Sequence, residues 1–132
     1  MIIRVWTAHA TPDGAEKCQA RFVEKVLPRL KPLAGYLGTS FLRRPDGDEV
    51  ELVLLTRWES LEAVRAFAGD DIDRAVVDTE AAAIMTRWDA RVRHYEVAFE
   101  DGASAPGARR RAPSTTRPRP SKRTPRSGKK KR

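Results

Sequence analysis

The chain has little of what most metal and cofactor sites require. It contains one cysteine, Cys18, and two histidines, His9 and His94, among 132 residues. A single cysteine excludes an intrachain disulfide, and these dispersed residues form no spaced metal cluster. No glycine-rich phosphate loop is present, because GYLG lacks the GxGxxG spacing of a Rossmann-type nucleotide site. We therefore expect neither a metal nor a bound cofactor.

Long hydrophobic runs are also missing. No run approaches the ~18 apolar residues that a membrane span needs. The start, MIIRVW, lacks the basic and apolar regions of a secretory signal. The lone cysteine gives no sign of an oxidising compartment. We therefore expect a cytoplasmic protein without a membrane span.

Charge and hydrophobicity are unevenly distributed along the chain. Residues 1–100 carry 14 Lys/Arg and 17 Asp/Glu, whereas residues 101–132 carry 12 Lys/Arg and a single acidic residue, Asp101. The second segment has no Val, Ile, Leu or aromatic side chain. It therefore cannot bury enough apolar surface to offset the entropy lost on ordering. We predict one folded domain over 1–100 and a disordered basic tail over 101–132.

The basic tail has two possible roles. Its charge resembles that of a nucleic-acid-binding arm, whose contacts would be directed at phosphates and sensitive to salt. Because it has no aromatic residue to stack on bases, only nonspecific nucleic-acid binding is expected. The other role is that of a solvated segment that keeps an acidic domain soluble or binds anionic surfaces weakly.

The first third of the chain predicts a strand followed by an amphipathic helix. Ile2–Ala10 mixes β-branched and aromatic residues with polar ones, as strands do. Thr11 suits the N-cap of a helix and Pro12 its first position. Apolar residues then recur at spacings of three and four, which predicts one buried helical stripe: Ala15, Cys18, Phe22, Val26 and Leu30. Pro28 is expected to kink or end this helix.

The rest of the domain predicts a hairpin, short helices and a last strand. Two strands, Tyr36–Arg44 and Glu49–Trp58, flank the turn cluster PDGD. Ser60 is expected to cap a second helix that ends at Gly69. Three further elements are expected: a short helix from Asp70 or Asp71, a possible extra turn within Thr79–Met85, and a last strand from Trp88 to Phe99.

This order of elements predicts an α+β fold of ferredoxin-like βαββαβ type, a four-stranded antiparallel sheet with the helices on one face. The third strand has Val50, Leu52 and Leu54 on one side but Val53 and Leu55 on the other, so neither face suits solvent. An open sheet with an apolar second face favours packing on a second copy. We therefore predict a homodimer, a dimeric α+β barrel whose two sheets face each other and enclose a cavity.

Five segments carry a likeness to a known family: MIIRVW, GYLG, DGDEVE, LLTRWESLEAVRAFAGDDIDRAV and HYEV. Together they resemble the antibiotic biosynthesis monooxygenase (ABM) family of dimeric α+β barrels, over residues 1–99. That family includes oxygenases of polycyclic aromatic polyketides that use neither metal nor flavin, haem-degrading enzymes and quinol oxygenases. The resemblance implies the fold and the dimer more strongly than the reaction.

The haem-degrading branch of the family can be compared residue by residue. The resemblance places its asparagine near Thr7, its tryptophan at Trp58 and its haem-ligating histidine near Val77. Only the tryptophan is present in this chain. Since valine cannot ligate iron, haem degradation is disfavoured.

Cofactor-free oxygenation requires a dry aromatic pocket, a base that removes a proton from the substrate, and a positive group that holds the resulting anion. Four aromatic residues are candidates for the substrate-binding walls: Trp6, Trp58, Trp88 and Tyr36. Each of them is equally suited to an ordinary core position, because aromatic residues in sheets usually pack in the core.

Strand alternation predicts which side chains meet. Arg4 and Trp6 share one face of the first strand, and Ile3 and Val5 share the other, which suits contact with helices. An arginine beside a tryptophan is more reasonable in a polar-edged cavity than under helices. If the faces of the strands coincide, four side chains converge in the cavity: Arg4, Trp6, Trp58 and His94.

Two of these residues are the candidate catalytic groups. His94 is the candidate base, because an unperturbed histidine pKa near 6.5 suits proton abstraction at neutral pH. Arg4 is the candidate holder of the substrate anion. Alternatively, His94 is a surface or interface histidine bonded to a backbone carbonyl.

The sequence thus predicts a cofactor-independent monooxygenase that acts on an aromatic or quinol-like small molecule. The alternative is a non-catalytic or stress-related dimeric barrel that binds a small hydrophobic molecule, with its tail binding nucleic acid or anionic surfaces weakly. A titratable group pointing into the cavity favours turnover, whereas an entirely apolar cavity favours binding alone.

Overall fold

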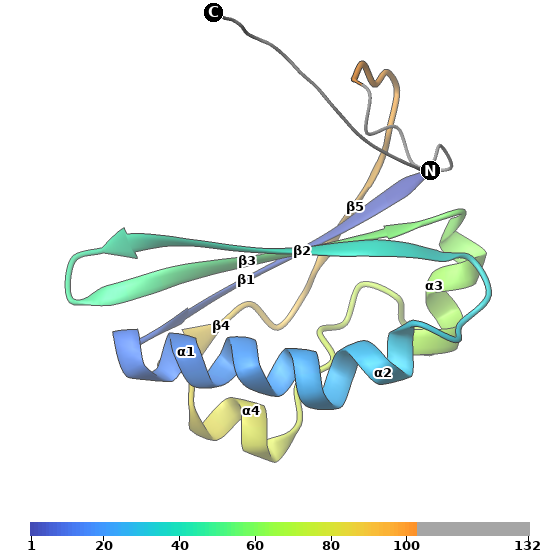
Figure 1. Ribbon diagram of the computed structural model, residues 1–132. Coiled ribbons are helices and arrows are strands. Elements are labelled where there is room, and N and C mark those ends of the chain that lie inside the picture. The colour runs from blue at the N-terminus through green and yellow to red at the C-terminus, as the bar shows by residue number, and fades with distance from the viewer. Residues whose placement is uncertain (103–132) are drawn as a thin grey trace, which may run out of the picture. The chain divides into compact units, whose positions relative to one another are not determined.

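The computed structural model describes residues 1–102, so the basic tail predicted for 101–132 lies almost entirely outside the described residues. Residues 1–97 form one compact unit. It has the predicted α+β architecture, an antiparallel sheet with helices along one face (Figure 1). Within residues 1–102, no helix is long and apolar enough to cross a membrane.

The sheet is built around the first strand. Its strands are β1 (Ile2–Ala10), β2 (Tyr36–Asp46), β3 (Glu49–Trp58), β4 (Arg87–Trp88) and β5 (Arg93–Glu96). Their order is β2-β3-β1-β4, and β5 also pairs with β1. Arg4 lies opposite Thr56 on one side and His94 on the other, and Trp6 lies opposite Leu54. The register therefore brings Arg4 and His94 into direct contact range.

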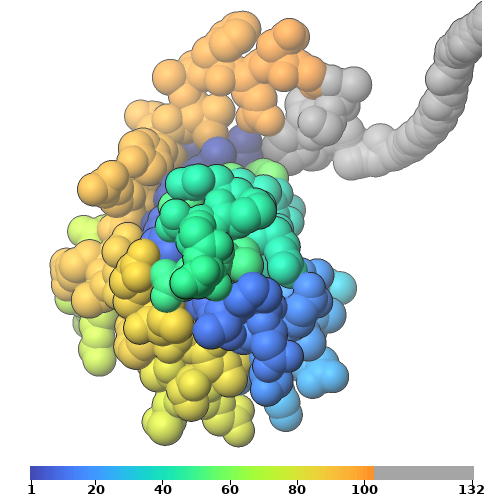
Figure 2. All heavy atoms as spheres, turned by 90° about the vertical axis from the view of Figure 1, so that its left-hand side faces the viewer, coloured from blue at the N-terminus to red at the C-terminus, as the bar shows by residue number. Residues whose placement is uncertain are grey.

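The helices are α1 (Pro12–Arg21), a π-helical turn η1 (Phe22–Val26), α2 (Leu27–Leu30), α3 (Leu61–Ala68) and α4 (Thr79–Ala83). The predicted caps are confirmed, because the Thr11 side chain accepts from the Gly14 N–H and the Ser60 side chain from the Ala63 N–H. Figure 2 shows α1 and α4 side by side beneath the tip of the β2–β3 hairpin.

The first helix does not end at Pro28 but passes it through a wider turn. The Leu27 N–H donates to the Phe22 carbonyl five residues earlier, which is the π-helical pattern. A proline at position 28 has no N–H to donate, and its ring clashes with the carbonyl of residue 24 in an ideal helix. The wider turn just before Pro28 relieves this conflict, and the helix continues to Leu30.

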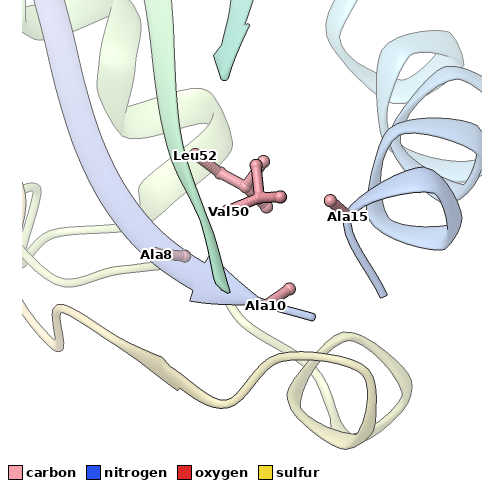
Figure 3. Close-up of a cluster of buried hydrophobic side chains, with 5 residues drawn as sticks. All are labelled: Ala8, Ala10, Ala15, Val50 and Leu52. Carbon is pink, nitrogen blue, oxygen red and sulfur yellow. The ribbon is translucent and has the colours of Figure 1, made fainter. Parts of the chain in front are cut away.

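The core under β1 and β3 is made of small residues. Ala8, Ala10 and Ala15 are fully buried and pack with Val50 and Leu52 (Figure 3). The methyl side chains of β1 let α1 approach the sheet closely, which draws this face of the strand beneath the helices.

The prediction that Ile3 and Val5 face the helices is wrong. Arg4 and Ala8 are buried, at 5% and 0% exposure, and it is their face that the helices cover. The shared face of Arg4, Trp6, Trp58 and His94 is confirmed by the register, but its neighbour is the helical layer of the same chain. A cavity lies on this face, between the sheet and the helices of the same chain.

The short helix expected from Asp70 or Asp71 is absent, and an extended loop takes its place. The Ala75 N–H donates to the Ala90 carbonyl at 2.9 Å, and the Val92 N–H donates to the Asp73 carbonyl at 2.7 Å. The backbone of this loop thus finds its partners across the chain instead of within a helical turn. The same contacts interrupt the last strand, which was expected as one strand from Trp88 to Phe99 and is divided into β4 and β5.

The centre of the second face of the sheet carries apolar side chains, and charged residues such as Glu51 and Arg57 lie at its ends. Val5 and Thr7 lie opposite Leu55 and Val53 on this face, and Leu42 of β2 is 46% exposed beside them. Val5, Val53, Leu55 and Leu42 form a partly exposed apolar surface, which the segment 89–95 borders.

Candidate substrate cavity

A cavity of about 130 Å³ lies between the sheet and the helical layer. Its walls are mostly apolar and come from both layers and from the loop before α4. It is lined by Arg4, Trp6, Cys18, Arg21, Phe22, Val26, Arg29, Phe41, Leu52, Leu54, Phe67, Val76, Val77, Asp78, Ala81, Ile84, Met85 and Val92. The cavity is therefore an apolar space bordered by three arginines and one aspartate.

Arg4 is a buried cation at this cavity. Its guanidinium donates to the carbonyls of Ile72 and Arg74, the latter at 2.9 Å, and to His94 Nε2 at 3.1 Å. All three acceptors are neutral, and no carboxylate of residues 1–102 lies within ion-pair distance. Burial lowers the pKa of Arg4 to about 10, although the charge of Asp73 partly opposes this. Arg4 therefore remains a cation at neutral pH, without an anionic partner.

His94 lies behind Arg4 and not in the cavity. Its Nδ1 is 2.9 Å from Asp73 Oδ1, and its side chain is only 7% exposed. A neutral ring that donates from Nδ1 to Asp73 and accepts at Nε2 from Arg4 satisfies both contacts. Burial, with a smaller contribution from the charge of Arg4, lowers the pKa of His94, while Asp73 opposes the shift. Its lone pair is thus held by Arg4, which leaves no free nitrogen for a base facing the cavity.

Trp6 is the tryptophan that lines the cavity. Its indole Nε1 donates to the Asp89 carbonyl at 2.8 Å, so the polar end is satisfied and the ring face is left as an apolar wall. This hydrogen bond fixes the ring against the loop between β4 and β5.

The other three predicted aromatic residues are outside the cavity. Trp58 is fully buried; it donates from Nε1 to Thr56 Oγ1 at 2.9 Å and stacks on Phe67 with ring centroids 6.2 Å apart. Tyr36 packs edge-on against Trp58 at 5.4 Å. Trp88 is 38% exposed and borders a shallow outer depression. Trp58 and Tyr36 are therefore core residues, because their rings pack against other side chains and do not line the cavity.

Two cavity arginines were not anticipated from the sequence. Arg21 and Arg29 are eight residues apart, which in an ideal α-helix separates their directions by roughly 80°. The extra residue in η1 reduces this to roughly 20°, since the wider turn absorbs one position. The π-helical turn therefore brings both guanidinium groups to the cavity side. Pro28 was the only sequence signal of this irregularity.

Only one of these arginines is paired. Arg21 binds Asp78, and it lies 3.3 Å from a Glu80 carboxylate oxygen. Asp78 also caps α4 by accepting from the Ala81 N–H at 2.9 Å. That backbone hydrogen bond, together with Arg21, lowers the pKa of Asp78. The carboxylate thus makes two close contacts, and the charge of Arg29 lowers its pKa further.

The lining residues do not fit a haem. Val77, the position that the resemblance matched to a haem-ligating histidine, lines the cavity, and neither histidine does. Cys18 is present there, but burial raises the pKa of its thiol, whereas iron binds the thiolate. Within residues 1–102, no group of three or more His, Cys, Asp or Glu is placed to hold a metal ion.

Comparison with known proteins identifies the family. The family profile described as Antibiotic biosynthesis monooxygenase matches residues 1–79, and the chain therefore belongs to the ABM family. A putative antibiotic biosynthesis monooxygenase from Bacillus cereus is 21% identical, with a TM-score of 0.55 over 78% of this chain and 96% of that one.

A second solved structure is the haem degrader MhuD from Mycobacterium tuberculosis, with two haems bound in its active site. It is 24% identical, with a TM-score of 0.51 over 77% of this chain and 100% of that one. At these identities the two likenesses show the fold alone. No curated protein matches the sequence.

Proposed function

We propose that this chain is a cofactor-independent monooxygenase that oxidises a small phenolic or quinol-like molecule in the cavity between its sheet and its helices. The observation that carries the proposal is Arg4, a cation 5% exposed that borders an apolar cavity and has no carboxylate partner within residues 1–102. Membership of the ABM family supports the reaction class.

Arg4 would act by stabilising the substrate anion. A guanidinium in a water-poor site favours the ionised phenol, and each pKa unit of that preference is worth about 1.4 kcal/mol. The anion is electron-rich and reduces oxygen itself. A quinol and one O₂ give a hydroxyquinone and one water: the substrate supplies all four electrons, one oxygen atom enters the product, and the other leaves as water with two substrate hydrogens.

His94 is assigned as a positioning residue instead of the base. Its Nε2 accepts from Arg4 and its Nδ1 contacts Asp73, so the two contacts fix the guanidinium at the cavity wall. The substrate proton would then leave to water at the cavity mouth, driven by the cationic surroundings of Arg4, Arg21 and Arg29.

The cavity volume sets the size of the substrate. An apolar protein cavity of ~150 Å³ holds one benzene, and this cavity measures about 130 Å³. It therefore suits a single ring, and a polycyclic substrate would require the helices to move away from the sheet. Trp6 and Phe41 provide flat aromatic surfaces for such a ring.

The homodimer is part of this proposal. The apolar surface around Val5, Val53, Leu55 and Leu42 is what supports it, because a second copy packed there would cover all four side chains. A Leu55→Asp substitution should give monomers in sedimentation velocity, because it places a charge at the centre of that surface. An unchanged sedimentation coefficient would contradict this interface.

The function is tested by oxygen uptake with a panel of phenols, quinols and anthrones. We expect enzyme-dependent uptake and one atom of isotopically labelled oxygen in the product. Arg4→Gln should lower the rate by about tenfold or more, since charge-assisted contacts contribute ~1.5–3 kcal/mol. Arg65→Gln, which removes an exposed charge on α3, is the matched control.

No enzyme-dependent uptake with any substrate of the panel would refute the oxygenase. Ligand binding without uptake would favour the alternative, a dimeric barrel that only binds a small molecule. Weak nucleic-acid binding by residues 101–132 and a cytoplasmic location remain predictions from the sequence.

A further inference from the structure

Two of the three cavity arginines lack an anionic partner. Arg4 is buried and donates only to two backbone carbonyls and a neutral imidazole. Arg29 is exposed, and it makes no hydrogen bond or ion pair with any of residues 1–102. Buried charges in proteins are normally paired, and an unpaired one carries the cost of its desolvation. The lowered pKa of Arg4 is the physical sign of that cost.

Both unpaired guanidinium groups face the same ring. The guanidinium carbon of Arg4 is 5.7 Å from the centroid of Phe67, and that of Arg29 is 6.0 Å from it. The two carbons are therefore at most about 12 Å apart, which a single-ring ligand and its substituents can span. Contact with an aromatic face compensates each cation only weakly, by about 0.5–2 kcal/mol.

The single carboxylate at the cavity leaves this charge in place. Asp78 binds Arg21 and the N-terminus of α4. The charge of Arg29 also acts on this carboxylate, but no ion pair joins Asp78 to Arg29 or Arg4 within residues 1–102. The cavity walls therefore carry a net charge of two positive units around an apolar space. A neutral hydrophobic ligand would fill the space and leave both charges unpaired.

We propose that the ligand of this cavity is a small aromatic acid: one ring between Trp6 and Phe41, an oxygen anion at Arg4 inside, and a carboxylate at Arg29 towards solvent. The proposal rests on the proposed function for the oxidisable oxygen at Arg4, and it adds the carboxylate as the determinant of specificity. Arginine suits this role because its planar fork matches a carboxylate.

The test compares an acid with its neutral analogue of the same shape. Benzoate and benzamide are titrated into the full-length protein by calorimetry, without oxygen and at physiological ionic strength, so that turnover cannot contribute. We expect benzoate to bind about threefold more tightly than benzamide, because an exposed ion pair such as the one proposed at Arg29 is worth ~0.2–1 kcal/mol and threefold is ~0.65 kcal/mol.

A matched pair of variants locates the site. Arg29→Gln should weaken benzoate binding by about threefold, as expected for a partly exposed ion pair, and leave benzamide binding unchanged. Lys25→Gln removes a charge from the exposed side of the same helix, outside the cavity, and should change neither. Equal losses in the two variants would show diffuse attraction, including that of the basic residues 101–132, and would overturn the proposal.

Two further outcomes separate this proposal from the oxygenase. If benzamide binds as tightly as benzoate, the acid site is refuted, even if oxygen uptake is observed with gentisamide, the amide of a quinol acid. If benzoate binds preferentially but gentisate, the quinol acid itself, supports no oxygen uptake, the acid site stands and the oxygenase does not.

Discussion

Replacing His94 by glutamine isolates the contact that holds Arg4. His94 contacts Arg4 of β1 and Asp73 of the loop before α4, and its other charged or titratable neighbours are Arg93 and Tyr95 of β5. A glutamine can accept from Arg4 through its oxygen and donate to Asp73 through its amide, but it cannot take up a proton. The variant therefore retains the contacts with Arg4 and Asp73 but has no group at position 94 that can be protonated.

The sign of the pH effect follows from the lowered pKa of His94. The unfolded side chain binds a proton with a pKa of 6.5, and the native one only at lower pH, because burial and Arg4 disfavour the charged ring. Well above pH 6.5 the ring is neutral in both states and its contribution is constant. As the pH falls from 6.5 towards the native pKa, the unfolded state takes up the proton first. Native stability then falls, by at most about 1.4 kcal/mol per pH unit.

Urea unfolding of wild type and His94→Gln across mildly acidic and neutral pH measures this difference. The free energy of unfolding of wild type should fall relative to the variant below pH 6.5, and the two should run parallel above it. His94→Ala, which leaves a donor of Arg4 without its acceptor, should be less stable than wild type by about 1.5–3 kcal/mol at neutral pH. This difference should shrink below pH 6.5, because only wild type loses stability through the histidine.

The control is His9→Gln, which replaces the other histidine, on the opposite face of β1. Parallel pH profiles for wild type and His94→Gln would refute the assignment of His94 as the neutral acceptor of Arg4. So would an identical pH effect of the His9 substitution.

Three further predictions follow from packing and burial. Trp58→Ala should lower the free energy of unfolding by about 3–5 kcal/mol, and Trp88→Ala by about 1 kcal/mol or less; equal losses would contradict the core role of Trp58. Gly14→Ala should cost about 1–3 kcal/mol in urea unfolding, because an added Cβ would lie 2.6 Å from the Ile84 carbonyl oxygen; unchanged stability would contradict this contact. Cys18, whose thiol pKa is raised by burial, should react with iodoacetamide more slowly in the native than in the unfolded protein at neutral pH; equal rates would contradict its burial.

Local sequence signals predicted the elements that depend on local chemistry. Thr11 and Ser60 cap their helices because a side-chain oxygen accepts from an N–H three residues on, a contact encoded entirely within each turn. The hairpin around PDGD depends on its turn residues in the same way. The helix expected from Asp70 failed because its backbone groups find partners at Arg4 and near Ala90, which are distant in sequence.

The sequence predicted which side chains of the candidate site lie on the same face of the sheet, but not the role of each side chain. Strand alternation correctly put Arg4, Trp6 and His94 on one face, since that depends only on period and register. It could not show that the His94 lone pair accepts a hydrogen bond from Arg4. Judged by residue type alone, His94 can act as a base and Arg4 can bind an anion. Arg21 and Arg29 were missed because their alignment depends on a π-helical turn, which changes the helical period that sequence analysis assumes.

The orientation of the sheet was the decisive unknown. Composition alone could not determine it, because both faces of the central strands carry apolar and charged side chains. What distinguishes them is the size of the side chains. Ala8 and Ala10 leave room for a helix to lie directly on β1 at one end, and Gly14 makes that approach closer still. At the other end of the strand, Ile2 packs against a second buried cluster that contains Leu30, Trp58 and Val64. Arg4 and Trp6 lie between the two clusters and line the cavity. A sheet that is covered closely at both ends encloses a cavity between the two clusters, and Arg4 is the buried cation at the wall of that cavity.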